Sequence, residues 1–277
     1  SKDLEEVIRY QEALKYASNE CRNNPITNKI IKQIHYLLLQ GDVRKNSNFQ
    51  AGEFRTQQNM VDKHVPPKAV DVPILMGNLE RYINDDLRDD LPVLIKVALI
   101  HAQFETIHPF PDGNGRVGRV LIPLYLYKQG YIKSPHFFLS QELEKNKFKY
   151  YSYLQGTRTK TVEGYTKWLN FFFSSVKMQA ERGIQFVNLL EALYEKVVNE
   201  VQHYINSNNV HSLVDAIFRR PYFTCDTLYN ETGISPSTLR RYVKLLYEHG
   251  IIYPCGSRLR NKIYVFLEMA DLLNHQQ

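Results

Sequence analysis

The segment 108–115, HPFPDGNG, constrains the fold most, because it interrupts a strongly helical pattern at one defined place. Before it, residues 92–106 are dense in aliphatic side chains and predict a helix that is buried on most sides. A second helix is predicted to begin at about Arg116. Since the two prolines exclude a continuous helix, His108 is expected to end the first helix and to project from a fixed turn.

Helical periodicity predicts further helices along the first 206 residues. They cover about 3–20, 26–40, 70–84, 146–155, 165–177 and 178–206. The polar stretch 51–67 predicts a surface loop or hairpin, and a loop rich in proline and aromatic residues is expected after Gly130. The polar run at 206–209 marks a domain boundary.

The last part of the chain predicts a separate small domain. A helix at 210–218 is followed by a helix-turn-helix pattern, 224–231 and 236–249, with Gly233 in the turn and Ser235 as a cap. Two short strands are predicted within 253–266, around a wing at Gly256-Ser257.

Composition excludes several classes of protein. With 43% apolar and 23% charged residues, the 277-residue chain is typical of a globular protein, and no apolar run approaches the ~18 residues of a membrane span. No signal peptide begins the sequence. Cys21, Cys225 and Cys255 lie far apart, which argues against a disulfide framework or a zinc site and fits a reducing cytoplasm. A formal charge of +6 is small for a protein that works mainly on nucleic acid.

The residues after His108 are suited to phosphate chemistry. Residues 113–115, Gly-Asn-Gly, tolerate positive φ, so their backbone N–H groups can form an anion nest beside the positive end of the next helix. Arg116 and Arg119 lie on one face of that helix and can both reach a polyphosphate. Asp112 is suited to hold Mg²⁺ between two phosphates. These features, within twelve residues, indicate a site for phosphate chemistry.

Each feature alone has a simpler explanation. A single histidine is usually structural, two arginines on a helix are usually a solvated face, and a Gly-Asn-Gly segment is usually only a turn. A zinc site from His101, His108 and Asp112 lacks both the H-E-x-x-H spacing and a fourth ligand. Their occurrence together and in order favours the phosphate site.

The string HPFPDGNGRVGR at 108–119 resembles the Fic family motif, H-x-F-x-[DE]-G-N-G-R-x-x-R, at every fixed position. The resemblance extends over about 30–177. The segments similar to the family's flap are 52–55, 58–59 and 65–67, and those similar to its closing helices are 150–151, 168 and 171–172. In this family Phe110 is implied to anchor the turn in the core.

The resemblance implies a mainly α protein, namely a Fic-type helical bundle with a β-hairpin flap, plus a small C-terminal winged helix-turn-helix domain known as a bacterial partner of the Fic core. The expected segments are an N-terminal helical segment 1–35, the Fic catalytic core 36–178, a connecting helix 179–208 and the winged-helix domain 209–277. A bacterial, cytoplasmic protein without a membrane partner is expected.

The activity implied is protein adenylylation. AMP would pass from ATP, with Mg²⁺ or Mn²⁺, to a Ser, Thr or Tyr hydroxyl of a target protein or of the enzyme itself, and pyrophosphate would leave. His108 would take the hydroxyl proton and Asp112 would hold the metal. The implied ATP-binding residues are Val61, Asp62, Lys63, His64, Asp112, Gly113, Asn114, Gly115, Arg116, Val117, Gly118, Arg119, Tyr150 and Tyr151.

Strand addition to the flap is expected to hold the target segment. The target-binding flap residues implied are Thr56, Gln57, Gln58, Asn59 and Met60.

Fic enzymes are commonly restrained by a helix bearing [ST]-x-x-x-E-[GN], whose glutamate pairs with the second motif arginine, here Arg119. Because the chain begins at Ser1 rather than Met, we expect that helix upstream and an unrestrained activity for this chain. The string TKTVEG at 159–164 fits the pattern but lies where the family does not place its inhibitor, so we interpret it as a coincidence.

Two other functions stay open. One is Fic-type transfer of a different phosphate-containing group, by phosphorylation, uridylylation or phosphocholine transfer; Gly115 favours AMP, because the kinase-like branch of the fold carries lysine there. The other is a regulator that binds DNA through the winged helix. Its predicted DNA or partner contacts are Arg240, Arg241 and Lys244, with Arg258, Arg260 and Lys262 in the wing.

Against DNA binding, residues 201–277 carry eight Lys and Arg against six Asp and Glu, and many winged helices bind proteins. The sequence leaves open the target protein and the oligomeric state, a homodimer included.

Overall fold

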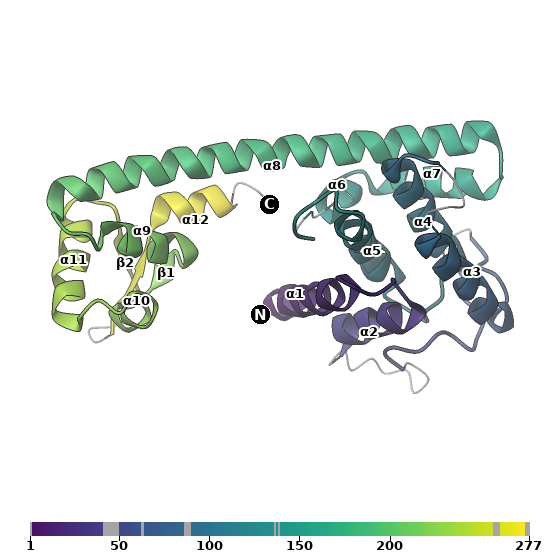
Figure 1. Cartoon of the computed structure of the whole chain (residues 1–277), viewed down its shortest axis with the longest axis horizontal. Coiled ribbons are helices and arrows are strands. Elements are labelled where there is room, and N and C mark those ends of the chain that lie inside the picture. Colours follow the sequence, from purple (N-terminus) through teal and green to yellow (C-terminus); the bar gives the residue numbers. More distant parts are fainter. Residues whose placement is uncertain are drawn as a thin grey trace. The chain divides into compact units, whose positions relative to one another are not determined.

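The computed structural model describes residues 2–40, 50–61, 64–85, 90–135, 137, 139–256 and 261–274. The chain divides into two compact units, Ser1–Ala180 and Glu181–Gln277, each of which has its own hydrophobic core (Figure 1). Of the predicted functional residues, Asp62 and Lys63 lie outside the described residues, as do Ser257, Arg258 and Arg260 of the predicted wing.

The first unit is built from helices. They are α1 (Lys2–Cys21), α2 (Asn28–Leu39), the 3-10 turn η1 (Ala69–Asp71), α3 (Val72–Asn84), α4 (Val93–Ile107), α5 (Asn114–Lys128), α6 (Ser140–Lys145), α7 (Lys147–Arg158) and the beginning of α8 (Val162–Tyr204). The predicted helices are therefore confirmed, and α6 was not predicted. Two predicted helices, 165–177 and 178–206, prove to be one continuous helix, because no proline interrupts the chain between them.

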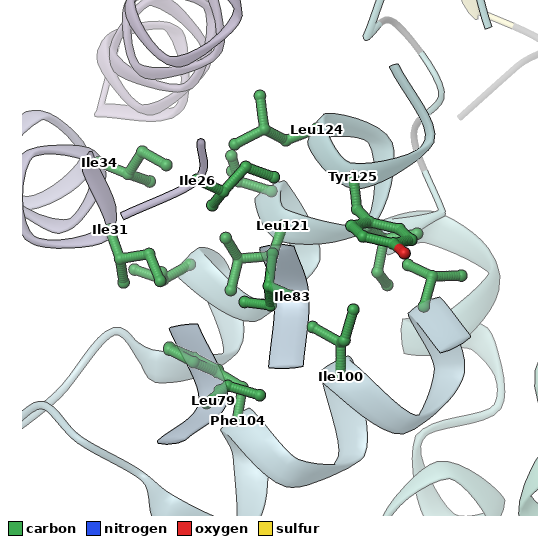
Figure 2. Close-up of a cluster of buried hydrophobic side chains, with 14 of the residues drawn as sticks. Ile26, Ile31, Ile34, Leu79, Ile83, Ile100, Phe104, Leu121, Leu124 and Tyr125 are labelled. Carbon is green, nitrogen blue, oxygen red and sulfur yellow. The ribbon is translucent and has the colours of Figure 1, made fainter. Parts of the chain in front are cut away.

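Helices α4 and α5 pack against each other within the core of the first unit (Figure 1). Apolar side chains from the segment around α2 and from α3, α4 and α5 meet there, as Figure 2 shows for Ile26, Ile31, Ile34, Leu79, Ile83, Ile100, Phe104, Leu121, Leu124 and Tyr125. Each fully buried aliphatic or aromatic side chain of this kind contributes about 1.5–3 kcal/mol to folding. Because α4 and α5 are packed together, both ends of the segment 108–113 that connects them are held in fixed positions.

Gly118 lets α5 approach α4 closely. A Cβ atom added at Gly118 would meet the Glu105 carboxyl and would lie 3.2 Å from both His101 Cε1 and Phe104 Cδ1. The glycine in the second variable position between the two motif arginines is thus a packing residue, which fixes how near α5 lies to the end of α4.

The second unit continues α8 and adds a small mixed fold. Its other elements are α9 (Val210–Arg219), β1 (Tyr222–Phe223), α10 (Cys225–Thr232), α11 (Pro236–Glu248), β2 (Tyr253–Cys255), β3 (Ile263–Val265) and α12 (Leu267–Asn274). The strands form an antiparallel sheet of order β1-β3-β2, with Tyr222 and Tyr253 both opposite Val265. Strand β1 and helix α12 were not predicted.

Local signals in the second unit act as predicted. Gly233, with φ 66°, ends α10 in the left-handed conformation, and the Ser235 hydroxyl caps α11 by accepting the Thr238 N–H. No helix in the described parts of the chain combines the length and the apolar character needed to cross a bilayer.

Candidate active site

His108 directly follows α4 in the left-handed conformation, with φ 50° and ψ 60°. Its N–H donates to the Phe104 carbonyl at 2.9 Å and closes the last turn of the helix. A residue other than glycine rarely adopts positive φ, and the conformation persists only where the surroundings hold it. The prediction that His108 ends the helix and projects from a fixed turn is confirmed.

Arg55 is one of the groups that hold this turn. The side chain is buried, and its Nε donates to the His108 carbonyl at 2.9 Å. Its Nη2 donates to the carbonyls of Pro67 at 2.5 Å and Ile107 at 3.3 Å, and its backbone N–H donates to Pro109. One guanidinium thus connects the end of α4 with the segment around residue 67, and it places a positive charge at the negative end of the helix dipole.

We expect Arg55→Lys to destabilise the turn at His108, because an ammonium group cannot donate to several fixed carbonyls with the geometry of a guanidinium. The carbonyls left without a donor cost about 1–3 kcal/mol. Urea unfolding followed by Trp168 fluorescence measures this loss, since the single tryptophan of the chain is buried in the same unit. The exposed Arg22→Lys is the matched control; equal stability of the two variants would contradict the role given to Arg55.

Phe110 and His35 fix the next part of the turn. Phe110 is fully buried, as expected, and stacks on the His35 ring at 3.9 Å between centroids. His35 Nδ1 accepts the Gly52 N–H at 2.8 Å, so its Nε2 carries the proton and donates to the Asp112 carbonyl at 3.0 Å. Burial lowers the pKa of His35 to about 3, and the ring is therefore neutral.

The turn ends where α5 begins. Gly113 adopts φ 74°, and the buried Asn114 side chain closes the loop by accepting the Phe110 N–H at 2.9 Å and donating to the Phe110 carbonyl at 2.8 Å. The Asn114 amide is therefore a structural group, and the candidates for binding an anion are the backbone N–H groups at the start of α5. Those of the first turn of α5 have no carbonyl partner within the helix, which is the arrangement of an anion site.

Three charged side chains lie beside this helix start. Asp112 is half-buried, and its Oδ1 accepts the Gly113 N–H at 2.5 Å. Arg116 and Arg119 are half-buried on the first turns of α5, and Gly115 leaves the room that Arg119 Nη1 occupies, since a Cβ atom at Gly115 would lie 3.0 Å from it. The structure thus brings the carboxylate, the two arginines and the helix N-terminus together after His108.

The flap segment reaches the same end of α4. Val61 and His64 exchange backbone hydrogen bonds of 2.9 Å, and this single bridge is the extent of β pairing within the described flap residues, 50–61 and 64–67. His64 Nε2 donates to the Thr106 carbonyl at 2.9 Å, and Asn59 Nδ2 donates to Phe110 at 3.0 Å. Side chains therefore hold the described flap residues against the end of α4, and Met60 is 76% exposed.

The two tyrosines of α7 differ in position. Tyr150 is buried, and its hydroxyl donates to His101 Nε2 at 2.8 Å while His101 Nδ1 donates to the Gly118 carbonyl at 3.0 Å. Tyr151 is half exposed. The Tyr150 hydroxyl thus lies in the core of the first unit, where it contacts α4. The structure also leaves no zinc-type set around His101, and no group of three or more metal-type side chains gathers within the described residues.

Arg158, at the end of α7, is a site residue that sequence reasoning missed. Its guanidinium donates from Nε to Thr106 Oγ1 at 3.3 Å and from Nη2 to the Glu105 carbonyl at 3.4 Å. Arg158 thus contacts the end of α4, as Arg55 does, but it comes from a segment that follows α4 in the sequence, whereas Arg55 precedes α4. No signal near position 158 pointed to this contact, because its partners lie more than 50 residues away.

The imidazole of His108 is held in its neutral form. Its side chain is 14% exposed, and burial lowers its pKa to about 4, with the nearby positive charges of Arg55 and Arg158 acting in the same direction. Its Nδ1 lies 3.9 Å from Glu105 Oε2. A neutral imidazole at the mouth of an anion site can accept a proton from an incoming hydroxyl.

The comparisons with known proteins point to one family. A model of the Fic/DOC family matches residues 25–126. Curated relatives include two proteins named protein adenylyltransferase Fic. The one from Aedes aegypti is 36% identical over 152 residues, which are 54% of this chain and 28% of the relative, and the one from Drosophila melanogaster is 33% identical over 151 residues, 54% and 29%. The chain thus spans less than a third of the length of these relatives.

Two solved structures share the fold. A Fic family protein from Desulfovibrio desulfuricans G20 superposes with a TM-score of 0.52 at 18% identity, over 94% of this chain and 75% of its own. A Fic domain containing signaling protein from Bacteroides thetaiotaomicron superposes with a TM-score of 0.51 at 21% identity, over 64% and 72%. At these identities the likeness concerns the fold alone.

Proposed function

We propose that this chain is a protein adenylyltransferase, because a model of the Fic/DOC family matches residues 25–126. It transfers AMP from ATP to a Ser, Thr or Tyr hydroxyl of a target protein, or of itself, and releases pyrophosphate. The observation that carries the proposal is the juxtaposition of a neutral, buried His108 with the N-terminus of α5 and its two arginines. The names of the curated relatives support the same activity.

In this reaction His108 is the general base. Its imidazole accepts the proton of the target hydroxyl, whose oxygen forms a bond to the α-phosphorus of ATP while the bond from that phosphorus to the pyrophosphate oxygen breaks. The N–H groups at the start of α5 bind phosphate oxygens, and Arg116 and Arg119 bind the departing pyrophosphate. Their helix is rigid, so these donors need no rearrangement when charge moves onto the leaving group.

The remaining nucleotide contacts are assigned to the flap and α7. Val61, Asp62, Lys63 and His64 would line the nucleotide from one side and Tyr151 from the other. The flap residues 56–60, of which all but the half-buried Asn59 are exposed, would pin the target segment through backbone hydrogen bonds. The exposure of Thr56, Gln57, Gln58 and Met60 supports this role, because these residues are accessible to a target segment.

Asp112 fits a divalent cation. It is a carboxylate beside an anion site, which suits a hard cation that completes its shell with phosphate oxygens and water. Such a cation, Mg²⁺ or Mn²⁺, would neutralise charge on the departing pyrophosphate.

We expect Asp112→Asn to weaken metal-dependent ATP binding by about tenfold or more and to leave metal-free binding nearly unchanged, because the lost charge serves the cation. Calorimetric titration with ATP, with Mg²⁺ and with excess chelator, separates the two. The exposed Asp71→Asn serves as the control. Full transferase activity in excess chelator would contradict the assignment.

Intact-mass spectrometry tests the function itself. After incubation with ATP and Mg²⁺, the chain or an added target protein should gain the mass of one AMP residue, and it should not gain that mass with His108→Ala. A gain of a phosphate mass would instead support the alternative of another Fic-type transfer.

A second candidate function is DNA binding by residues 209–277, which we propose to be a winged helix-turn-helix domain. The observation that favours it is α11, which buries Leu239, Tyr242, Val243 and Leu246 and exposes Arg240, Arg241 and Lys244. Fluorescence anisotropy of a labelled duplex tests it, since affinity should fall with salt and with Arg240→Ala combined with Lys244→Ala. An affinity for DNA that changes neither with salt nor with these substitutions would contradict DNA binding through α11 and would favour a protein partner for this surface.

A further inference from the structure

Glu105 lies one helical turn before His108, on the last turn of α4. It is 6% exposed, and its Oε2 lies 3.9 Å from His108 Nδ1. Within the described part of the chain, Glu105 Oε1 and His108 Nδ1 are both buried and have no hydrogen-bond partner in the structure. A buried imidazole nitrogen thus lies near a buried carboxyl group, one oxygen of which has no partner, and unsatisfied polar groups of this kind are costly in a protein core.

The surroundings keep a space for this carboxyl group. Gly118 of α5 has no side chain where a Cβ atom would meet Glu105 Oε1. Arg119 of α5 and Arg158 of α7 place positive charge nearby, which favours the carboxylate, while burial opposes it and raises the pKa of Glu105 to about 7. Burying an apolar residue at this position would cost less free energy than burying a carboxyl group, so the acidic residue points to a role at the site.

We propose that Glu105 is a positioning residue for His108, whose carboxylate accepts the Nδ1–H of the imidazole and so leaves Nε2 as the atom that takes the proton of the target hydroxyl. This inference rests on the proposed transferase function. The proton moves from the hydroxyl to Nε2, Nδ1 keeps its own proton, and the carboxylate balances the charge of the imidazolium that forms. The 3.9 Å separation shortens when substrate is bound, as is common for catalytic hydrogen bonds.

A rival acceptor for Nδ1 is the main-chain carbonyl of Glu105, which also favours the protonated imidazole. That carbonyl already accepts the Arg158 Nη2–H at 3.4 Å. If it alone oriented the ring, the side chain of Glu105 would have no effect on the reaction. Glu105→Gln separates the two, because it keeps the main chain and the shape of the side chain and removes only the charge.

The positioning role implies a particular pH dependence. The titratable and charged groups near Glu105 are His108, Arg119, Tyr150 and Arg158, and those near His108, besides Glu105, are Arg55, His64 and Arg158. Burial raises the pKa of Glu105 to about 7, so the carboxylate form that balances the imidazolium gains population as the pH rises through neutrality. The transfer rate should follow that rise, and Glu105→Gln should lack it.

The control variant is Glu142→Gln. Glu142 is also 6% exposed, and it lies on α6, where its Oε1 accepts the Asn146 amide at 2.9 Å. We expect Glu105→Gln to lower kcat by about 10- to 100-fold, the usual effect of removing the group that orients a functional histidine, with the Kd for ATP within about twofold of the wild type. Glu142→Gln should retain kcat and the pH profile. Wild-type kcat and an unchanged pH profile in a folded Glu105→Gln would overturn the proposal.

Nitrogen NMR of the wild-type imidazoles gives a second readout that needs neither activity nor a variant of Glu105. The His108 signal, assigned by its absence in His108→Asn, should show the proton on Nδ1; a proton on Nε2 would overturn the proposal even if Glu105→Gln fails to fold. If the wild type transfers no AMP, the proposed function fails; a proton on Nε2 would separately overturn the role of Glu105, and a proton on Nδ1 that moves in Glu105→Gln would assign the orientation of the ring to the carboxylate rather than to the main-chain carbonyl.

Discussion

Replacing His108 should lower AMP transfer by about 10²- to 10⁴-fold while the Kd for ATP changes by less than about twofold. The reason is geometric. In the proposed mechanism the imidazole faces the incoming hydroxyl, whereas the N–H groups of α5 with Arg116 and Arg119 face the phosphates. Its loss should therefore raise the barrier without emptying the nucleotide site. Steady-state rates and calorimetric Kd values, measured on the same preparations, separate the two effects.

The choice of substitution matters because His108 adopts φ 50°. Asparagine tolerates the left-handed conformation better than alanine, so His108→Asn keeps the turn and removes the base. The exposed His211→Asn, in the second unit, controls for the loss of a histidine elsewhere. Comparable transfer rates for His108→Asn and the wild type would exclude His108 as the base.

Acidification from about pH 7 to about pH 5 should lower the free energy of unfolding of the first unit on the order of 4 kcal/mol. His35 and His101 are fully buried, and burial lowers the pKa of His35 to about 3 and that of His101 to about 4. Below about pH 6.5 the unfolded chain binds protons that the folded chain does not. The stabilisation that the neutral rings of His35 and His101 give the folded state is therefore complete above pH 6.5. It is lost as the pH falls, by about 2 kcal/mol for each ring at about pH 5.

The contributions of His108 and Glu105 to the free energy of unfolding nearly cancel each other between about pH 7 and about pH 5. His108, whose pKa is lowered to about 4, adds a further loss, and Glu105, whose pKa is raised to about 7, binds a proton in the folded state and offsets about 2 kcal/mol. Urea unfolding at a series of pH values, followed by Trp168 fluorescence, measures the net slope.

His101→Asn makes this test specific. The asparagine amide can still donate to the Gly118 carbonyl, but it does not titrate. The variant should be less stable at neutral pH, and its unfolding free energy should fall about 2 kcal/mol less than that of the wild type on acidification. His211→Asn should keep the wild-type slope. An unchanged slope in His101→Asn would show that His101 is not the neutral, buried group described here.

Features coded by neighbouring residues were predictable from the sequence. The end of α4 at His108, the left-handed Gly233 and the cap at Ser235 each depend on side chains within a few positions, and the structure has all three. The helical fold followed from periodicity in the same way. The one helix α8 was predicted as two because a change in the apolar pattern, without a proline, does not break a helix.

The groups that support the site could not be predicted in this way. Arg55, Glu105 and Arg158 take their roles from partners brought near only by folding; Arg55, for example, binds a carbonyl 53 residues away. Tyr150 is a related case, since the family resemblance implies a place near the nucleotide, and its hydrogen bond to His101 in the core could be found only from the structure.

The most direct measurement of the central claim is the fate of two labels on ATP. The chain is incubated with Mg²⁺ and either α-labelled or γ-labelled ATP, with His108→Asn beside the wild type. AMP transfer predicts protein-bound label from the α position alone, and little label of either kind on His108→Asn. Label retained from the γ position, or equal α label on both proteins, would contradict adenylyl transfer by this site.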